Sequence, residues 1–221
     1  MDNTYTVNIL AVTPLTHDVR QFKVEKPEGY TFIPGQATEI SLPLAKDDRH
    51  PFTFTGLNEW DHLEFSIKIY PERHGITDRL GHLKPGDELI LHDVWGAIQY
   101  KGPGTFIAGG AGITPFIAIF RQLHQDGALP GNQLLFANKT VRDIILRDTW
   151  DEWLGKNVHY VLSKEKAPGC AFGRIDAAYI KDRLAGFDGH FYVCGPDQMV
   201  TDVRQALESL GAATDLVTVE V

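Results

Sequence analysis

The chain has 221 residues, of which 43% are hydrophobic and 23% charged, and its formal net charge is −8. This composition is typical of a globular protein with one large or two small domains, and it excludes a mainly disordered chain. The acidic balance argues against nucleic-acid binding, and no apolar run approaches the roughly 18 residues that a membrane span needs. Because the N-terminus lacks the pattern of a signal peptide, we expect a cytoplasmic protein.

The cysteine and histidine content limits the kinds of metal site. The chain has two cysteines, Cys170 and Cys194, which are too few for a disulfide framework, a zinc ribbon or an iron–sulfur centre. Its nine histidines are scattered without the spacing of metal ligands. We therefore expect no metal site.

Residues 1–100 predict short antiparallel strands. Apolar side chains alternate with polar ones over residues 5–11 and again over 63–69, where Glu64, Ser66 and Lys68 are expected to face solvent. Proline and glycine turns at 26–29 and 84–87 separate such segments. This pattern predicts a small antiparallel β-barrel or sandwich.

The pattern changes after residue 102, where short continuous apolar runs alternate with helical periods. The runs are Thr105–Ala108, Leu134–Ala137, Val158–Val161 and Phe191–Cys194. Helical faces lie at 116–123 and 199–210, and Gly211 is a suitable stop for the second helix. We therefore predict a parallel α/β domain at 102–221 after a β-barrel domain at 1–101.

A glycine-rich turn, Gly109–Pro115, joins a predicted strand to a predicted helix. Thr114 can cap this helix, and Pro115 suits its first position. Backbone N–H groups of such a turn can approach a pyrophosphate, although its sequence differs from the GxGxxG motif of common dinucleotide-binding domains. The alternative is a tight strand–helix turn with no ligand.

A second turn, Cys194–Asp197, follows the last apolar run. A cysteine at a strand tip before Gly195 and Pro196 lies where open α/β sheets bind ligands. The alternative is a buried, inert cysteine, which is commoner. In the first half, Arg49–Thr55 taken alone is typical of an ordinary edge strand.

Taken together and in this order, these segments resemble the ferredoxin–NADP reductase superfamily, in which a flavin-binding barrel precedes a nicotinamide-nucleotide domain. Phe32–Gln36 is similar to the family's PGQ segment, and His50–Thr53 to its RxYS or RxYT flavin motif. Gly75–Thr77 is similar to its G-x-x-S/T step. The turns at 110–115 and 194–196 are similar to its nucleotide loop and its CGP motif.

Two departures bear on the choice of nucleotide and phosphate contacts. His50 stands where the flavin motif has arginine. The segment Phe136–Thr140, continuing to Arg147, is similar to cytochrome b5 reductases, which favour NADH. Lys139 and Arg142 are the opposing features, because either cation could pair with the 2′-phosphate of NADPH.

The resemblance implies FAD as cofactor and NADH or NADPH as electron donor, with NADH favoured. It implies flavin contacts at His50, Pro51, Phe52, Thr53, Ile67, Lys68, Ile69, Gly75, Ile76 and Thr77. It implies nucleotide contacts at Gly110, Gly112, Ile113, Thr114, Pro115, Asn138, Lys139, Cys194, Gly195, Pro196 and Asp197. Thr53, Cys194 and Glu220 are the candidate catalytic residues, and the alternative for Glu220 is a solvated terminal charge.

The implied activity is a flavin-dependent NAD(P)H oxidoreductase that passes electrons to a separate acceptor, such as a flavodoxin, a ferredoxin, a cytochrome or a small molecule. Basic residues could steer an acidic carrier, or they could form an ordinary solvated face; they are Arg49, Lys68, Arg73, Arg79 and Lys84. The first alternative is a flavin-bound electron-transfer subunit without its own NAD(P)H oxidation. The second is a nucleotide sensor that binds no flavin.

Overall fold

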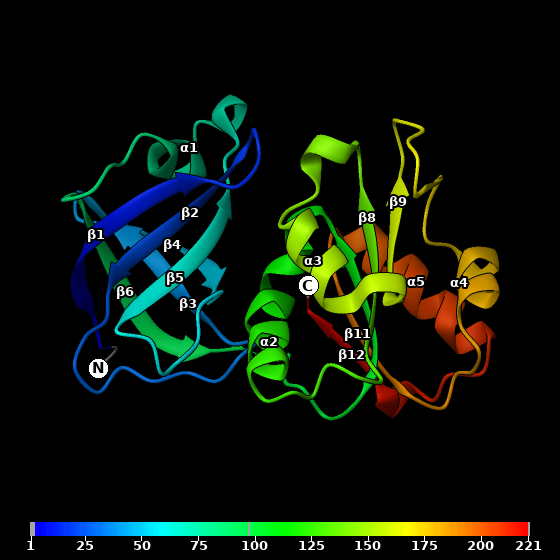
Figure 1. The fold of residues 1–221 in the computed structure, drawn as a ribbon. Helices are drawn as coiled ribbons and strands as arrows, with labels where there is room; N and C mark the ends of the chain where they lie inside the picture. Colours follow the sequence, from blue (N-terminus) through cyan, green and yellow to red (C-terminus); the bar gives the residue numbers. More distant parts are fainter. Residues whose placement is uncertain (1–2, 97, 221) are drawn as a thin grey trace. The chain divides into compact units, whose positions relative to one another are not determined.

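The computed structural model describes residues 3–96 and 98–220, the last of these by its backbone alone. The chain divides into two compact units. The first comprises Met1–Gln99 with Thr114–Gln122, and the second comprises Tyr100–Ile113 with Leu123–Val221. Each unit contains one six-stranded sheet (Figure 1). The boundary predicted at 101/102 stays a prediction, and the segment Thr114–Gln122 groups with the barrel half.

The first unit is an antiparallel barrel with strand order β4-β3-β6-β1-β2-β5. A bridge between Phe54 and Phe65 joins the two outer strands, so the sheet closes on itself. The strands are β1 (Tyr5–Pro14), β2 (Val19–Glu25), β3 (Ala37–Leu42), β4 (Ala45–Thr53), β5 (His62–Lys68) and β6 (Glu88–Trp95). A short 3₁₀ turn, η1 (Pro71–Arg73), precedes α1 (Ile76–Gly81).

The alternation predicted for this unit holds in β1 from Tyr5 to Ala11, although the pairing with β2 shifts between Ile9 and Ala11. It fails in the second predicted segment. In β5 the polar residues Glu64 and Ser66, expected at the surface, are buried at 2% and 7% exposure. The cause is Arg121, which approaches from the helix segment that groups with this unit and binds the Glu64 carboxylate.

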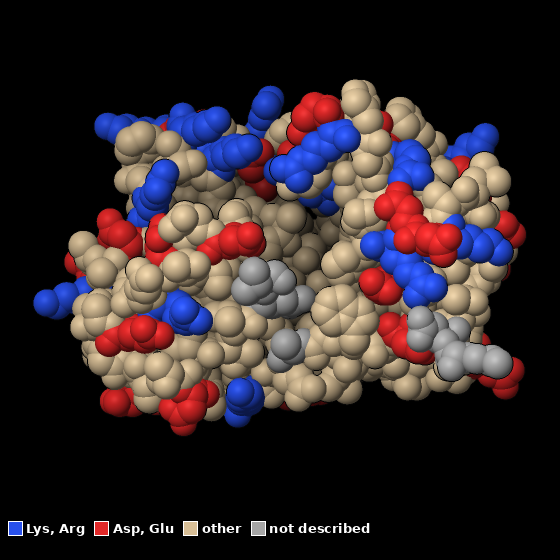
Figure 2. Space-filling view, turned by 180° about the vertical axis from the view of Figure 1, so that it is seen from behind, with Lys and Arg blue, Asp and Glu red and all other residues tan. Residues whose placement is uncertain are grey.

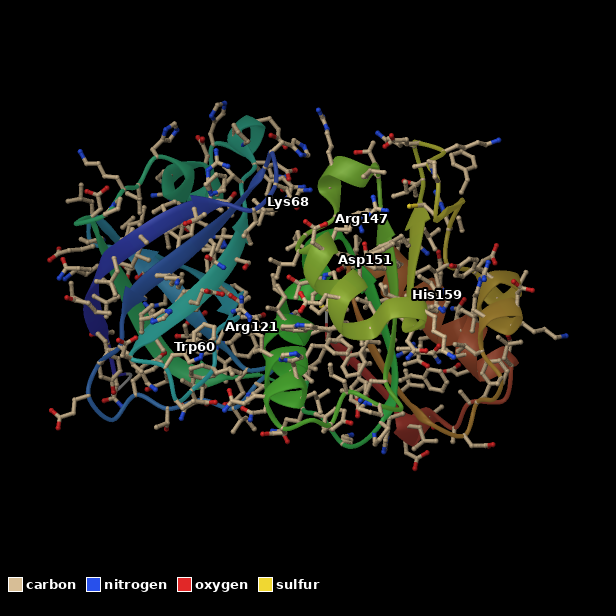
Figure 3. All side chains as sticks on the ribbon, in the orientation of Figure 1. Trp60, Lys68, Arg121, Arg147, Asp151 and His159 are labelled. Carbon is tan, nitrogen blue, oxygen red and sulfur yellow. The ribbon has the colours of Figure 1, made fainter. Side chains whose placement is uncertain are left out.

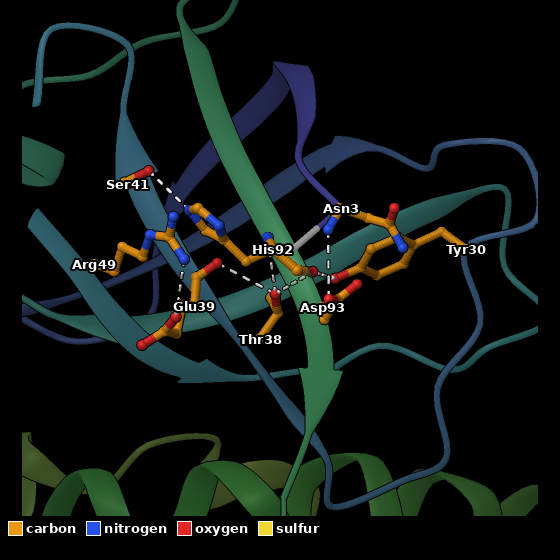
Figure 4. A network of polar contacts seen from close by, with 8 residues as sticks. All are labelled: Asn3, Tyr30, Thr38, Glu39, Ser41, Arg49, His92 and Asp93. Atoms are coloured by element: carbon orange, nitrogen blue, oxygen red, sulfur yellow. Dashed lines mark hydrogen bonds and ion pairs between the residues drawn. The ribbon is translucent and has the colours of Figure 1, made fainter. Parts of the chain in front are cut away.

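A buried polar network holds β3 against β6 inside the barrel (Figure 4). The backbone carbonyl of His92 accepts hydrogen bonds from Tyr30 Oη at 2.8 Å and Thr38 Oγ1 at 2.9 Å. The His92 ring nitrogen Nε2 lies 3.0 Å from Ser41 Oγ. Burial raises the pKa of Tyr30 to about 12, so this hydroxyl remains a neutral donor at physiological pH.

The second unit is a parallel sheet with helices between its strands, which confirms the predicted fold class. Its order is β10-β9-β8-β7-β11-β12. The strands are β7 (Gly104–Gly109), β8 (Gln133–Asn138), β9 (Val158–Leu162), β10 (Cys170–Phe172), β11 (His190–Cys194) and β12 (Val217–Glu220). The helices between these strands in the chain are α2 (Thr114–Gln125), most of which groups with the first unit, α3 (Arg147–Leu154), α4 (Ala177–Arg183) and α5 (Asp197–Ser209). The 3₁₀ turns are η2 (Gly110–Ile113), η3 (Val141–Asp143), η4 (Gly155–Asn157) and η5 (Thr214–Leu216).

The strand order reverses direction between β7 and β11. After β7 the chain continues outward through β8, β9 and β10, and then returns to add β11 and β12 on the other side. Open α/β sheets bind ligands beyond the carboxyl ends of the strands at such a reversal. Both predicted nucleotide turns lie at this position, after β7 and after β11.

Within residues 3–96 and 98–220, no helix is both long and apolar enough to cross a membrane. Gly211 follows α5 with a φ of +96°, as its predicted role in ending that helix requires.

Acidification should destabilise the second unit through His159, which lies in β9 (Figure 3). Burial, with a smaller effect of the nearby Arg183, lowers the pKa of His159 below its ordinary value of 6.5. The unfolded chain therefore binds this proton more readily than the folded chain. The stability is present above pH 6.5 and is lost as pH falls through the lowered pKa.

We expect urea unfolding midpoints to drop between pH 7 and pH 5 in the wild-type protein, and to drop less in the variant His159→Gln. His82→Gln is the control because the His82 side chain is 80% exposed. Equal pH slopes for the wild type and His159→Gln would contradict this prediction.

Candidate functional site

The two predicted nucleotide turns pack against each other in the second unit, backbone to backbone. A Cβ atom placed on Gly112 would lie 2.4 Å from the carbonyl oxygen of Cys194 and 2.6 Å from the Cα atom of Gly195. A Cβ atom on Gly195 would lie 3.2 Å from the Cα atom of Gly109. Glycine is therefore required at Gly112 by close approach, and not by an unusual φ angle. The packing brings both turns to one edge of the sheet.

The CGP turn is positioned by its strand. Cys194 ends β11, and its backbone pairs with Ala108 of β7 on one side and with Glu220 of β12 on the other. Pro196 immediately precedes α5, and Asp197 is the first residue of that helix. Cys194 is partly buried. The side chain of Glu220, a predicted catalytic group, lies outside the described residues.

The other nucleotide contacts lie in or beside the same loops. Ile113 is fully buried, so only its backbone can face a ligand. Thr114 and Pro115 form the first turn of α2. Gly110 follows β7 and begins η2 with a φ of +54°, and a Cβ atom there would have nothing within 4 Å. Gly110 therefore leaves open space at the mouth of the turn.

Asn138, at the end of β8, carries an amide group that the surrounding protein does not use. The residue is 7% exposed, and neither Oδ1 nor Nδ2 has a hydrogen-bond partner within residues 3–96 and 98–220. Buried amides are normally satisfied, so this orphaned pair at the ligand edge fits a bound polar ligand. The nucleotide contact at Asn138 stays a prediction.

The loop after β8 is held by acidic residues that sequence reasoning assigned no structural role. The Asp143 carboxylate accepts the backbone N–H of Thr140 at 2.8 Å and its hydroxyl at 2.5 Å, forming a capping box. Glu165, from the loop after β9, accepts the N–H of Val141 at 2.9 Å. The two loops are thus fixed to each other beside Lys139.

Basic side chains surround these loops. Figure 2 shows lysine and arginine side chains gathered over the end of the second unit where β8 and β9 finish. The exposed cations in the two loops are Lys139, Arg142, Lys164 and Lys166. Such a surface attracts a phosphorylated ligand without distinguishing NADH from NADPH by itself.

In the first unit, the predicted flavin segment forms the end of β4. Pro51, Phe52 and Thr53 pair with Glu39, Thr38 and Ala37 of β3. Phe52 is half-buried, and it packs partly against the barrel core. This pairing fixes the backbone of the motif independently of any ligand.

His50 belongs to a charged cluster that includes a residue from α1. Its Nε2 atom lies 2.8 Å from Asp48 Oδ1, and the guanidinium of Arg79 forms an ion pair with the other oxygen, Oδ2. These two bonds, His50 first and Arg79 second, lower the pKa of the Asp48 carboxyl below its usual range. Arg79 Nε is buried and has no hydrogen-bond partner among the described residues. This spare donor fits an anionic group of a bound flavin.

The segment before α1 leaves room for a ligand. Gly75 precedes the helix in extended conformation, and a Cβ atom there would meet nothing within 4 Å. Ile76 is 4% exposed and packs in the core, so it can offer a ligand only its backbone N–H. Thr77 follows it in the first turn, partly exposed.

Lys68 ends β5 and forms an ion pair with Asp18, from the β1–β2 turn, at 2.8 Å (Figure 3). Burial opposes ionisation of Asp18, but its bonds from Lys68 and Thr16 outweigh this and lower the pKa of the carboxyl. The Lys68 ammonium therefore has a carboxylate partner, as the Arg79 guanidinium has. Ile67 is 2% exposed, and the half-buried Ile69 donates its N–H to Asp18 O at 2.8 Å.

Comparison with known proteins gives the family. Residues 106–205 match the family model of the oxidoreductase NAD-binding domain. NADH-cytochrome b5 reductase 1 of Aspergillus terreus is 34% identical over 225 residues, which cover 90% of this chain and 75% of that protein. The chain belongs to the ferredoxin–NADP reductase superfamily. The predicted family is confirmed.

Two further comparisons cover nearly the whole of this chain. The reductase component of propane 2-monooxygenase of Mycolicibacterium goodii is 26% identical over 95% of this chain and 65% of that protein. The structure of a ferredoxin NADP+ reductase from Neisseria gonorrhoeae with bound FAD and NADP has the same fold, with a TM-score of 0.87, 19% identity and 98% coverage of both chains. The chain spans 60% to 75% of the length of the first curated relatives that it matches.

Proposed function

We propose that this protein is an FAD-dependent oxidoreductase that accepts hydride from NADH in preference to NADPH and delivers electrons to a separate acceptor. The main support is the packing of Gly112 against Cys194 and Gly195, because it brings the two predicted nucleotide-binding turns together at one edge of the parallel sheet. The preference for NADH is supported by the likeness to NADH-cytochrome b5 reductase 1. A cytoplasmic location stays a prediction.

In the nucleotide half, backbone N–H groups of Gly110, Gly112 and Ile113 bind the pyrophosphate, and Thr114 and Pro115 set the start of α2 beneath them. The amide of Asn138 binds a polar edge of the nucleotide, with Lys139 beside it. Cys194, with Gly195, Pro196 and Asp197 behind it, borders the nicotinamide ring, and Glu220 supplies a carboxylate near the same edge. Thr53, Cys194 and Glu220 are the catalytic residues in this proposal.

In the flavin half, Phe52 packs along the ring system and the Thr53 hydroxyl donates a hydrogen bond toward N5. Pro51 keeps this strand extended, which holds both side chains in place. The backbone of Ile67 and Ile69, with Lys68, borders the ribityl chain. His50 and the turn Gly75–Thr77 border the phosphates. When bound, the flavin accepts hydride from the nicotinamide and releases electrons to the acceptor.

The acceptor is proposed as a separate redox protein or a small molecule. The relatives bear names of reductases that serve different systems, a propane 2-monooxygenase in one case and cytochrome b5 in another. These names give a range of acceptor classes for this chain. They support a reductase component more than a complete oxygenase.

Anaerobic titration tests the proposal. The purified full chain should show flavin absorption bands, and NADH should bleach them faster than NADPH in stopped-flow measurements. FAD, and not FMN, should be recovered after heat release. Recovery of no flavin would favour a nucleotide sensor, and flavin bands that neither nucleotide bleaches would favour an electron-transfer subunit; either result would overturn the proposed activity. A clear preference for NADPH would overturn the choice of donor and assign specificity to the cations near Lys139.

A further inference from the structure

The flavin motif lacks its usual permanent cation at His50. A histidine ring has two nitrogen atoms for phosphate contacts, whereas an arginine guanidinium carries a permanent charge and a fork of five N–H donors. A pyrophosphate placed beside His50 therefore needs a fixed positive charge from another residue. Among the described residues, the guanidinium that shares a carboxylate with His50 comes from Arg79, in a different element of the fold.

Arg79 brings this guanidinium from α1 to the cluster at His50. Its ion pair with Asp48 places it on the carboxylate that also binds His50 Nε2. The Arg79 side chain is 41% exposed, and its buried Nε atom has no hydrogen-bond partner among residues 3–96 and 98–220. Arg79 also borders a cavity of about 380 Å³ whose other lining includes Leu83 and the acidic residues Asp87 and Glu88.

We propose that Arg79 supplies the phosphate-binding cation of the flavin site in place of the missing motif arginine, with Asp48 holding it beside His50. Arg79 is a binding residue in this proposal, because its unpartnered Nε can donate to a phosphate. Asp48 is a positioning residue that acts through Arg79. This inference rests on the proposed function, since it requires that the barrel binds a phosphorylated flavin.

Arg49 gives a matched control from the neighbouring position of β4. Its guanidinium approaches Glu39 Oε2 at 4.0 Å, and its side chain is 32% exposed. Glu39 pairs with Pro51 in the β3–β4 register, so Arg49 and Glu39 share a face on which Asp48 and His50 do not lie. Replacing Arg49 removes the same charge from a residue next to His50 whose ion pair is with Glu39 and not with Asp48.

The experiment compares FAD with riboflavin, which has the same ring system and no phosphate. The full chain, freed of bound flavin, is titrated with each ligand while flavin fluorescence is recorded. In Arg79→Gln we expect the Kd for FAD to rise by about 10- to 100-fold, as loss of a charge-assisted hydrogen bond predicts, and the Kd for riboflavin to stay within about twofold. Arg49→Gln should bind both ligands like the wild type.

Two further measurements guard against a purely structural effect. Arg79→Lys, which keeps the charge but not the forked donors, should retain part of the FAD affinity. Added salt should weaken FAD binding by the wild type more than by Arg79→Gln. Equal FAD affinity in Arg79→Gln and Arg49→Gln, or equal loss of FAD and riboflavin in Arg79→Gln, would overturn the role of Arg79. A wild-type chain that binds neither ligand would instead overturn the proposed function.

Discussion

Replacing Gly112 with alanine should weaken NADH binding at least about tenfold, which corresponds to about 1.4 kcal/mol. The added Cβ atom would lie 2.4 Å from the carbonyl oxygen of Cys194 and 2.5 Å from its carbonyl carbon. Both atoms belong to the backbone of a central strand, so they cannot move aside as the end of a flexible side chain could. The turn after β7 must therefore separate from the turn after β11, and the N–H groups that face the pyrophosphate lose their arrangement.

The measurement is the Kd for NADH by titration of the oxidised protein, together with the rate of flavin reduction at saturating NADH. Gly189→Ala is the matched control, because Gly189 lies in the same unit and a Cβ atom there meets nothing within 4 Å. Flavin content should be normal in both variants, since Gly112 belongs to the second unit. Wild-type NADH affinity in Gly112→Ala would contradict the assignment of this turn.

Replacing Arg121 with methionine should destabilise the first unit by about 3–5 kcal/mol. Arg121 Nη1 donates to Glu64 Oε1 at 2.5 Å and to the carbonyl of Thr55 at 2.7 Å, and Glu64 is only 2% exposed. The guanidinium also lies 5.0 Å from the centroid of the Trp60 ring, toward which it extends from α2 (Figure 3). Without Arg121, a buried carboxylate is left with one bond, from Thr55 Oγ1 at 2.9 Å.

Urea unfolding of the holoenzyme, followed by circular dichroism and flavin release, measures this loss. Glu64→Gln in the Arg121→Met background should recover much of it, because a buried amide costs less than an unpaired buried charge. Arg204→Met is the control, since its pair with Glu208 is exposed and should contribute less than about 1 kcal/mol. Similar decreases in the free energy of unfolding for Arg121→Met and Arg204→Met would contradict the prediction that the buried ion pair stabilises the protein more than the exposed one.

Local patterns in the sequence were sufficient for several strands, for helices α2 and α5 and for the order of the two fold types, but they did not indicate α1, α3, α4 or β10. Strand and helix periods arise from the geometry of each element, so the alternation at 63–69 and the apolar run at 191–194 needed no tertiary information. Turn residues behave likewise: Gly211 follows a helical period and adopts the positive φ that glycine favours after a helix. The glycine-rich turn and the CGP turn could be assigned to one sheet edge because parallel strands end on the same side.

Only the tertiary structure decided which polar residues are buried and which charges meet. Glu64 has the period of a solvent-facing residue, and it is buried because Arg121 reaches it from a helix 57 positions later in the chain. Asp48 and Arg79, 31 positions apart, form the cluster at His50 that no local spacing indicates. The unused amide of Asn138 is likewise visible only once its neighbours are placed. The physical reason is that burial and ion pairing depend on which segments pack together, whereas a residue's period reports only its own strand or helix.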